Sequence, residues 1–190
     1  MASGLSLVAA VGLAIKGGVN VVQLREKELP AADLLALAGE LRTVCGSRAL
    51  LIVNDRVDVA LAAGADGVQL GEKSIPVEAA RSVARDRLLI GRSVHSVEGA
   101  REAASADFLV LGTIYPSATH PGSPVGGLPL VRDVVRATDA EVVGIGGITA
   151  ANAGDVLTAG ATGVAVVGAI LGAPDPFWAA VELRRAIEGR

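Results

Sequence analysis

Aromatic residues make up only 2% of this 190-residue sequence, and cysteine occurs once, at Cys45. A core so poor in aromatic rings must be built mainly from Ala, Val, Leu and Ile, and the sequence has few of the stacking side chains that single-stranded nucleic acids use. The net charge of −3 provides no basic excess for a phosphate backbone. One cysteine excludes an intrachain disulfide framework and a cysteine-rich metal site. We therefore expect a cytoplasmic protein that does not bind nucleic acid.

Long hydrophobic runs without interruption are also missing. The N-terminal segment MASGLSLVAAVGLAIKGG is apolar, but it has neither the basic start nor the cleavage site of a secretion signal. Residues 156–174 carry no charge, yet four glycines interrupt them, and their centre, GVAVVG, is typical of a buried strand. We expect no membrane span.

Glycine, in contrast, is abundant, with 24 residues, and it recurs in a short sequence motif that we call the repeated phrase. A helix-like stretch ends in glycine and a short apolar run follows, as in KGGVNVVQL (16–24), AGADGVQL (63–70) and AGATGVAVV (159–167). ASADFLVL (104–111) is the same phrase with Ser in place of Gly. Glycine is favoured where a helix ends, and short apolar runs are typical of parallel strands that are buried on both faces.

The repetition predicts strands that alternate with helices. The predicted strands are 19–24, 50–54, 67–70, 88–93, 108–112, 141–146 and 163–167. The predicted helices are 6–16, 31–44, 57–63, 76–85, 96–104, 128–137, 150–159 and 176–188. This alternation predicts an α/β fold, a TIM (β/α)8-type barrel that lacks its first strand, because the chain opens on a helix. A Rossmann-like open sheet is the rival, but no strand is followed by G-x-G-x-x-G. No linker divides the chain, so residues 1–190 are expected to form one domain.

In such a barrel the chemistry takes place at the carboxyl ends of the strands, which we call the rim. Polar residues gather at the predicted strand ends: Gln23, Arg25, Glu26, Lys27, Asn54, Asp55, Arg56, Gln69, Glu72, Lys73, Ser74, Arg92, Ser93, His95, Tyr115, Ser117, Thr119 and His120. Gly146, Gly147 and Gly168 follow the last two strands, where TIM barrels commonly bind phosphate. The alternative is that these glycines only tighten the turns.

Three groups of rim residues carry possible chemistry. His95 follows a strand and opens a helix, a position suited to general acid or base catalysis, although a lone His is often structural. Asp55 with Asn54 is suited to a divalent cation, or alternatively to capping the next helix. Arg25 and Lys27 supply positive charge for a diphosphate or a carboxylate. The alternative is that they are only solvent-exposed side chains at the rim.

Five runs, VVQLREK, IVNDRVDVALAAGADGVQLG, IGRSVHS, LGTIYPSATHPG and VVGIGGI, resemble the thiamine phosphate synthase superfamily. This superfamily includes thiamine phosphate synthase and thiazole tautomerase, both TIM barrels of thiamine biosynthesis. The resemblance covers the chain from Leu5 onward, with the motifs in the same order and at matching spacing. It also implies that the first strand of the family is absent from this sequence.

The resemblance implies roles for individual residues. The synthase joins a pyrimidine diphosphate to a thiazole phosphate, while Mg²⁺ and basic groups stabilise the departing pyrophosphate. Asp55 matches one Mg²⁺ ligand, if the synthase interpretation holds. The expected substrate contacts are Gln23, Arg25 and Lys27 for the diphosphate, Asn54 for pyrimidine or phosphate, Ser93 near the reacting groups, Gly146, Gly147 and Gly168 for the thiazole phosphate, and Ser117, Thr119 and His120 in the long loop.

Two positions depart from the pattern of the synthase. The second metal-binding Asp falls at Ser74 in GEKS, and the loop Lys falls at His120. Both losses weaken the machinery for the departing pyrophosphate. The tautomerase needs no metal, and its catalytic His falls on His95 in GRSVHS. We therefore expect a thiazole tautomerase without a cofactor, which aromatises carboxythiazole phosphate by proton transfer from and to His95.

Two alternatives stay open because Arg25, Lys27, Asn54 and Asp55 are retained. The first is a thiamine phosphate synthase that uses Mg²⁺ and a pyrimidine diphosphate as well as the phosphorylated thiazole. The second is a non-catalytic ligand-binding or regulatory homologue. A sugar-phosphate epimerase would need a paired Asp or a set of metal-binding His residues, which the sequence lacks. A homo-oligomer is compatible with either enzyme.

Overall fold

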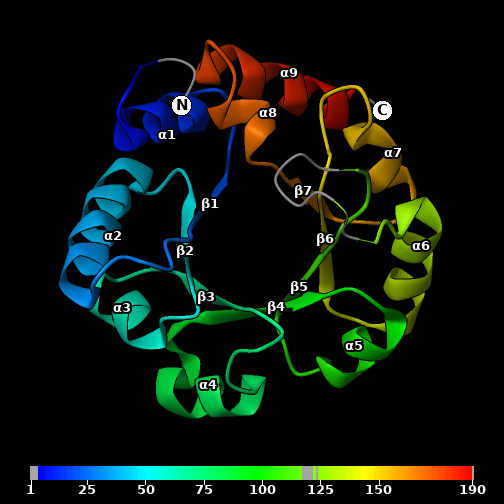
Figure 1. The fold of residues 1–190 in the computed structure, drawn as a ribbon, viewed down its shortest axis with the longest axis horizontal. Helices are drawn as coiled ribbons and strands as arrows, with labels where there is room; N and C mark the ends of the chain where they lie inside the picture. The colour runs from blue at the N-terminus through cyan, green and yellow to red at the C-terminus, as the bar shows by residue number, and fades with distance from the viewer. Residues whose placement is uncertain (1–3, 117–121, 123, 190) are drawn as a thin grey trace.

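The computed structural model describes residues 4–116, 122 and 124–189, and within them seven parallel strands form one sheet in chain order. The sheet curls into the wall of a barrel, and the helices lie outside it (Figure 1). The strands are β1 (Val21–Leu24), β2 (Leu50–Asn54), β3 (Gly67–Leu70), β4 (Leu89–Val94), β5 (Phe108–Leu111), β6 (Glu141–Ile145) and β7 (Gly163–Ala165). The predicted α/β barrel with seven strands is confirmed.

The helices of the described residues are α1 (Leu7–Lys16), α2 (Ala31–Cys45), α3 (Val57–Ala62), α4 (Val77–Ala84), α5 (Val97–Glu102), α6 (Gly127–Ala137), α7 (Ala153–Thr158), α8 (Gly168–Leu171) and α9 (Pro176–Glu188). A 3-10 turn, η1 (Arg85–Arg87), follows α4. Eight of these helices match predicted ones with shifts of a few residues at their ends, whereas α8 was not predicted. None of the described helices is both long and apolar enough to span a bilayer.

Each strand presents alternate residues to the helices and to the barrel interior. Leu51 and Ile90 belong to the helix-facing set; both are completely buried and form the core with the apolar faces of the helices. On the opposite face the register aligns Ile52, Gly67 and Leu89. A Cβ on Gly67 would lie 2.7 Å from Ile52 Cδ1 and 3.1 Å from Leu89 Cβ, so these three residues share the interior. This alternation decides which polar residues near the rim face the interior.

The repeated phrase of the sequence has a structural role at its acidic position. Asp66 precedes β3, and its Oδ2 accepts hydrogen bonds from a backbone N–H of β2 at 2.7 Å and from Arg42 Nη1 at 2.5 Å. Asp107 repeats the arrangement before β5, with a backbone N–H of β4 at 2.7 Å and Arg81 Nη1 at 3.1 Å. Thr162 replaces the Asp in the last phrase, and its hydroxyl donates to a carbonyl of β6 at 3.1 Å. We call Asp66 and Asp107 the strand clamps.

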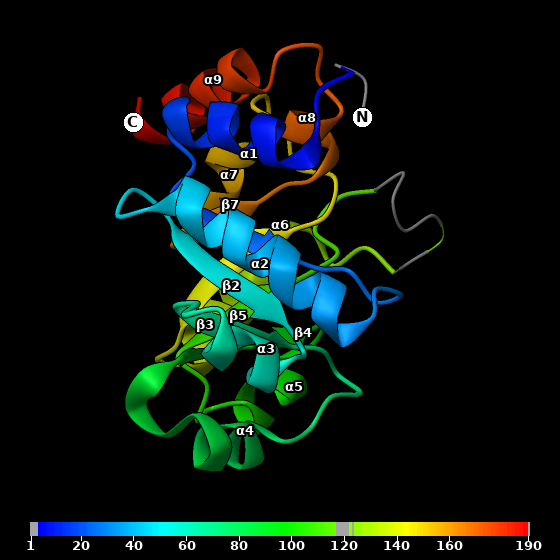
Figure 2. The same ribbon diagram turned by 90° about the vertical axis from the view of Figure 1, so that its left-hand side faces the viewer.

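Helix packing closes the ring, because no pairing joins β1 to β7 in the described part of the chain. Both strands are edges of the sheet, and near this seam the interior side chains of Val21 and Leu50 are 47% and 40% exposed. Helices α1 and α9 pack against each other across the seam (Figure 2). They approach closely at Gly17, where a Cβ would lie 2.7 Å from Ala180 Cβ and against the carbonyl oxygen of Phe177.

Replacing Gly17 by Ala is expected to destabilise the fold, because the added methyl group meets a backbone carbonyl that cannot rotate away. Overpacking of this kind costs about 1–3 kcal/mol, and each kcal/mol lowers the unfolding temperature by about 2–4 °C in a domain of this size. Thermal melts followed by circular dichroism measure the effect. The matched control is Gly39→Ala in α2, where a Cβ meets no atom within 4 Å and alanine favours the helix. Equal melting temperatures for the two variants would contradict tight packing at Gly17.

Candidate functional site

The structure places the predicted rim residues at one end of the barrel. Gln23 lies in β1, Asn54 ends β2 and Ser93 lies in β4, and the register gives all three to the interior face. Arg25 and Lys27 follow β1 in an exposed loop. Because the strands are parallel, their carboxyl ends meet at the same rim, and these five residues lie on the part of it formed by β1, β2 and β4.

Asp55 is held in place by hydrogen bonds from both sides. It follows β2 with φ of 60°, in the left-handed region, and its N–H donates to the carbonyl of Gln69 at 2.9 Å. Its Oδ1 accepts hydrogen bonds from the Gly71 N–H at 3.1 Å and from the Ser74 hydroxyl. Its Oδ2 accepts one from Asn54 Nδ2 at 2.9 Å. The carboxylate is therefore fixed between the end of β2 and the loop after β3.

These contacts decide the charge of Asp55. Burial is the largest single influence and acts to raise its pKa. The hydrogen bonds from Ser74, Gly71 and Asn54, together with the positive charge of Lys27, outweigh burial and lower the pKa below its ordinary value. Asp55 is consequently ionised at neutral pH, which is the state that a cation requires.

The residues at this position fit a magnesium ion only in a sparse form. Among the described residues, no three His, Cys, Asp or Glu side chains gather into a metal cluster. Asp55 is the carboxylate fixed at the end of β2, and Ser74 occupies the place where the resemblance implies a second one. Mg²⁺ is commonly held by one or two carboxylates together with waters and substrate phosphates. The donor set thus fits an ion that binds together with a diphosphate.

Gln69 is a functional candidate that the predicted substrate contacts did not include. Its side chain is 2% exposed, and its Nε2 donates a hydrogen bond to Ser93 Oγ at 3.0 Å. The sequence placed Gln69 at the rim, but gave no sign that its amide reaches across to the next strand. The available signal was a polar residue inside the apolar run GVQL, which in a buried strand must find a partner.

His95 ties together the ends of β4 and β5. Its Nδ1 is hydrogen-bonded to the Gly112 carbonyl, which accepts, so Nδ1 carries the hydrogen. Its Nε2 lies 3.8 Å from Glu72 Oε1, and the imidazole is 55% exposed. Arg92 holds the same loop by donating to the carbonyls of Ile75 at 3.1 Å and Glu72 at 3.0 Å. His95 therefore lies at the rim, where it connects the loop after β3 with the end of β5, and its catalytic role stays a prediction.

Two of the three predicted phosphate glycines are also required by packing. Gly146 has φ of 102° and Gly147 has φ of 64°. A Cβ on Gly146 would lie 2.6 Å from Thr113 Cγ2, and one on Gly147 would lie 2.8 Å from Tyr115 Cβ. Gly168, at the start of α8, faces open space, since a Cβ there meets no atom within 4 Å. Gly168 is thus the position where a substitution tests ligand access without disturbing the fold.

Three predicted contacts, Ser117, Thr119 and His120, lie outside the described residues. The replacement of the expected loop Lys by His120 therefore stays an observation on the sequence.

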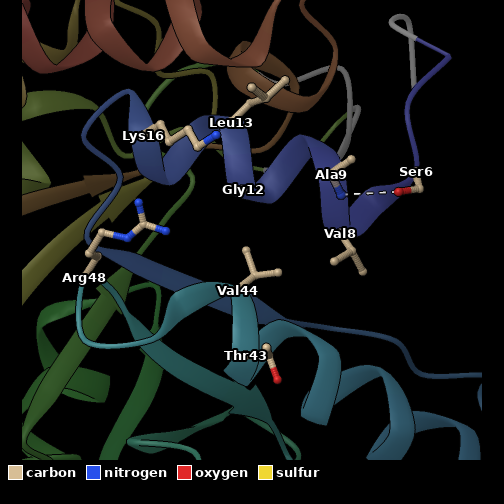
Figure 3. Close-up of a pocket in the computed structure, with 9 residues that line it drawn as sticks. All are labelled: Ser6, Val8, Ala9, Gly12, Leu13, Lys16, Thr43, Val44 and Arg48. Carbon is tan, nitrogen blue, oxygen red and sulfur yellow. Dashed lines mark hydrogen bonds between the residues drawn. The ribbon is translucent and has the colours of Figure 1, made fainter.

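A groove of about 630 Å³ lies between α1 and α2, away from the rim (Figure 3). Val8 and Leu13 of α1 and Val44 of α2 line it, and Lys16 and Arg48 flank one end. No predicted site residue lines this groove, so its size alone does not make it the site.

Fold and rim define a (β/α)-barrel protein with its candidate site at the carboxyl ends of the strands. The family model described as thiamine monophosphate synthase matches residues 2–170, and the chain belongs to this family. The thiamine-phosphate synthase of Roseiflexus castenholzii is 46% identical over 176 residues, which cover 90% of this chain and 77% of that protein. The thiamine-phosphate synthase of Methanospirillum hungatei is 42% identical over 179 residues, 92% of this chain and 87% of that protein.

A solved structure agrees with these relatives. The thiamine phosphate pyrophosphorylase from Pyrococcus furiosus superposes with a TM-score of 0.91 at 41% sequence identity. The match covers 97% of this chain and 90% of that one.

The expected tautomerase activity is wrong, because the similar proteins carry the name synthase at 42% and 46% identity. The expectation gave too much weight to two substitutions, at Ser74 and His120. In the structure the Ser74 hydroxyl donates a hydrogen bond to the Asp55 carboxylate. The other rim residues that the resemblance assigns to the diphosphate, Gln23, Arg25 and Lys27, are retained.

Replacing Ser74 by Ala is expected to raise the pKa of Asp55, because the carboxylate loses a hydrogen bond that favours its charged form. In the parent the lowered pKa stabilises the fold above the ordinary Asp value of 3.8, and this contribution is lost as the pH falls through the lowered pKa. NMR titration of the Asp55 carboxyl carbon in both proteins measures the shift. Asp58, which pairs with Arg56, is the internal control and should titrate identically in the two. An unchanged pKa of Asp55 would contradict the hydrogen bond from Ser74.

Proposed function

We propose that the protein is a thiamine phosphate synthase, which joins hydroxymethylpyrimidine diphosphate to a thiazole phosphate. The observation that carries the proposal is the arrangement of Asn54 and Asp55 beside the cationic loop after β1, in a chain 46% identical to a protein of that name. The resemblance assigns these same residues to the diphosphate and its metal.

The chemistry of this reaction explains the charges at the rim. The bond between the pyrimidine methylene carbon and the diphosphate oxygen breaks, and a bond from this carbon to the thiazole nitrogen forms. Negative charge builds up on the departing diphosphate, and fixed positive groups stabilise it. Arg25 offers a planar fork that suits phosphate oxygens, and Lys27 lies near enough to lower the pKa of Asp55. Together they place two positive charges beside the leaving group.

Asp55 is the residue that would hold Mg²⁺. When bound, Mg²⁺ neutralises charge on the diphosphate and makes it a better leaving group. The protein contributes a carboxylate that is already ionised and fixed by Gly71, Ser74 and Asn54. Because the carboxylate is fixed in advance, the protein needs less reorganisation when Mg²⁺ binds.

Incubation with both substrates and Mg²⁺ is expected to yield thiamine phosphate and inorganic diphosphate. Asp55→Asn keeps the shape of the side chain but removes its charge, and should lower kcat about a hundredfold. Asp58→Asn, an exposed neighbour paired with Arg56, is the control and should retain activity. Absence of product from the folded parent protein, with both substrates saturating across a Mg²⁺ titration, would refute the proposed function.

Replacing Ser74 by Asp is expected to strengthen Mg²⁺ binding, because it places a second carboxylate beside Asp55. The Mg²⁺ concentration for half-maximal activity should fall roughly tenfold. Without Mg²⁺ the two like charges repel, so the melting temperature of this variant should depend more steeply on Mg²⁺ than that of the parent. Ser74→Asn adds bulk without charge and is the matched control. A Mg²⁺ dependence unchanged from the parent would place the metal elsewhere.

Replacing Gly168 by Ala is expected to raise the KM for thiazole phosphate, because the methyl group enters the open space where the phosphate is proposed to approach the backbone. The unfolding temperature should not fall, since no atom lies within 4 Å of the new Cβ. Steady-state kinetics with the pyrimidine diphosphate saturating measures the effect. A KM that stays at the parent value would exclude a phosphate at this turn.

The cytoplasmic location and a homo-oligomeric state remain predictions from the sequence. Light scattering coupled to size-exclusion chromatography determines the second.

A further inference from the structure

Gln69 carries a polar atom without a partner in the barrel interior. Among the residues that the structure describes, its Oε1 is the buried side-chain polar atom that lacks a hydrogen bond. A Cβ on Gly91 would overlap Oε1, so the amide fits only because a glycine stands at the paired position of β4. A buried unsatisfied carbonyl destabilises a fold. An amide in this place therefore needs a reason other than packing.

The hydrogen bond to Ser93 explains why an amide lies at position 69. Gln69 Nε2 donates to Ser93 Oγ at 3.0 Å, and Ser93 follows Gly91 as the next interior position of β4 toward the rim. A hydroxyl has one hydrogen and two lone pairs. Since the bond from Nε2 uses a lone pair, the hydroxyl proton must point elsewhere. Ser93 is partly exposed, so its O–H is available to whatever binds at the rim.

We propose that Gln69 is a positioning residue that fixes the Ser93 hydroxyl as a hydrogen-bond donor to an acceptor atom of the bound substrate. The acceptor is a phosphate oxygen or a nitrogen of a heterocycle, and in this respect the inference rests on the synthase function proposed above. An apolar side chain at position 69 releases the hydroxyl to rotate. A carboxylate at position 69 can only accept, so it turns the Ser93 proton away from the substrate.

The main chain of Gln69 has a separate task that side-chain variants leave intact. Its carbonyl accepts a hydrogen bond from the Asp55 N–H at 2.9 Å. Substitutions at position 69 therefore test the amide group and not the link to Asp55.

The test is a double-mutant cycle of Gln69→Met and Ser93→Ala. Gln69→Glu is added as a variant that reverses the direction of the hydrogen bond between positions 69 and 93. Gln69→Met should lower kcat/KM about fivefold to tenfold, as expected for one lost hydrogen bond. Its unfolding temperature should equal or exceed that of the parent, because the unpaired carbonyl is gone. Gln69→Glu should lower kcat/KM further than Gln69→Met. In the Ser93→Ala background, Gln69→Met should cause no further loss, because the hydroxyl through which it acts is absent.

Ile52→Met is the matched control, since Ile52 is a buried interior residue of β2 with no part in this pair, and it should retain activity. Three results would overturn the inference. One is additive losses in the cycle. Another is a fall in unfolding temperature that accompanies the loss in Gln69→Met. The third is a Gln69→Glu variant as active as the parent.

Separate measurements identify the acceptor and separate this inference from the proposed function. A rise in KM for the pyrimidine diphosphate alone, or for the thiazole phosphate alone, shows which substrate Ser93 contacts. Calorimetry with inorganic diphosphate and with thiazole phosphate measures the dissociation constants of the same variants. The double-mutant cycle is thereby repeated for binding alone. Coupling in these constants without product formation would refute the synthase function but support the role of Gln69. No coupling for either ligand, together with no coupling in kcat/KM, would refute that role.

Discussion

The two strand clamps, Asp66 and Asp107, hold the register on which the opposite end of the barrel depends. Each carboxylate joins a backbone N–H of one strand to an arginine of the preceding helix, so helix and strand cannot slide independently. A slip of one residue would turn Asn54 and Ser93 from the interior to the helices. The clamps lie before their strands and the site lies after them. The chemistry of the rim is therefore set by bonds at the far end of the same strands.

The two ends of the barrel differ in how completely their polar groups are hydrogen-bonded or paired. At the clamps, charges are paired and backbone donors are used. At the rim, Asp55 has a left-handed backbone and Gln69 keeps a buried carbonyl without a partner. Such features lower stability and persist where function requires a fixed geometry. The polar groups at the rim therefore occupy positions that stability alone would not favour.

The sequence predicted the seven strands because one phrase repeats along the chain and parallel strands are buried on both faces. It missed α8 because four residues after a strand show no helical period. It located the rim, since strand ends can be read in order, but it could not show that Gln69 reaches Ser93 or that His95 bonds to Gly112. Those contacts depend on side-chain direction between neighbouring strands. The tautomerase expectation was overturned by the similar proteins, which carry the name synthase, and not by a contact in the structure.

The seam between β1 and β7 has a consequence for the proposed function. In the described chain these strands share no hydrogen bonds, and α1 against α9 closes the ring. The contacts that the resemblance implies for the diphosphate lie in β1 and just after it, whereas Gly168 follows β7. The two halves of the proposed site would therefore lie on opposite sides of the seam. A widening of the seam separates the half-sites without breaking any bond between strands. Under the proposed function, two substrates that meet between these sites would bridge the seam and join the two edge strands of the sheet.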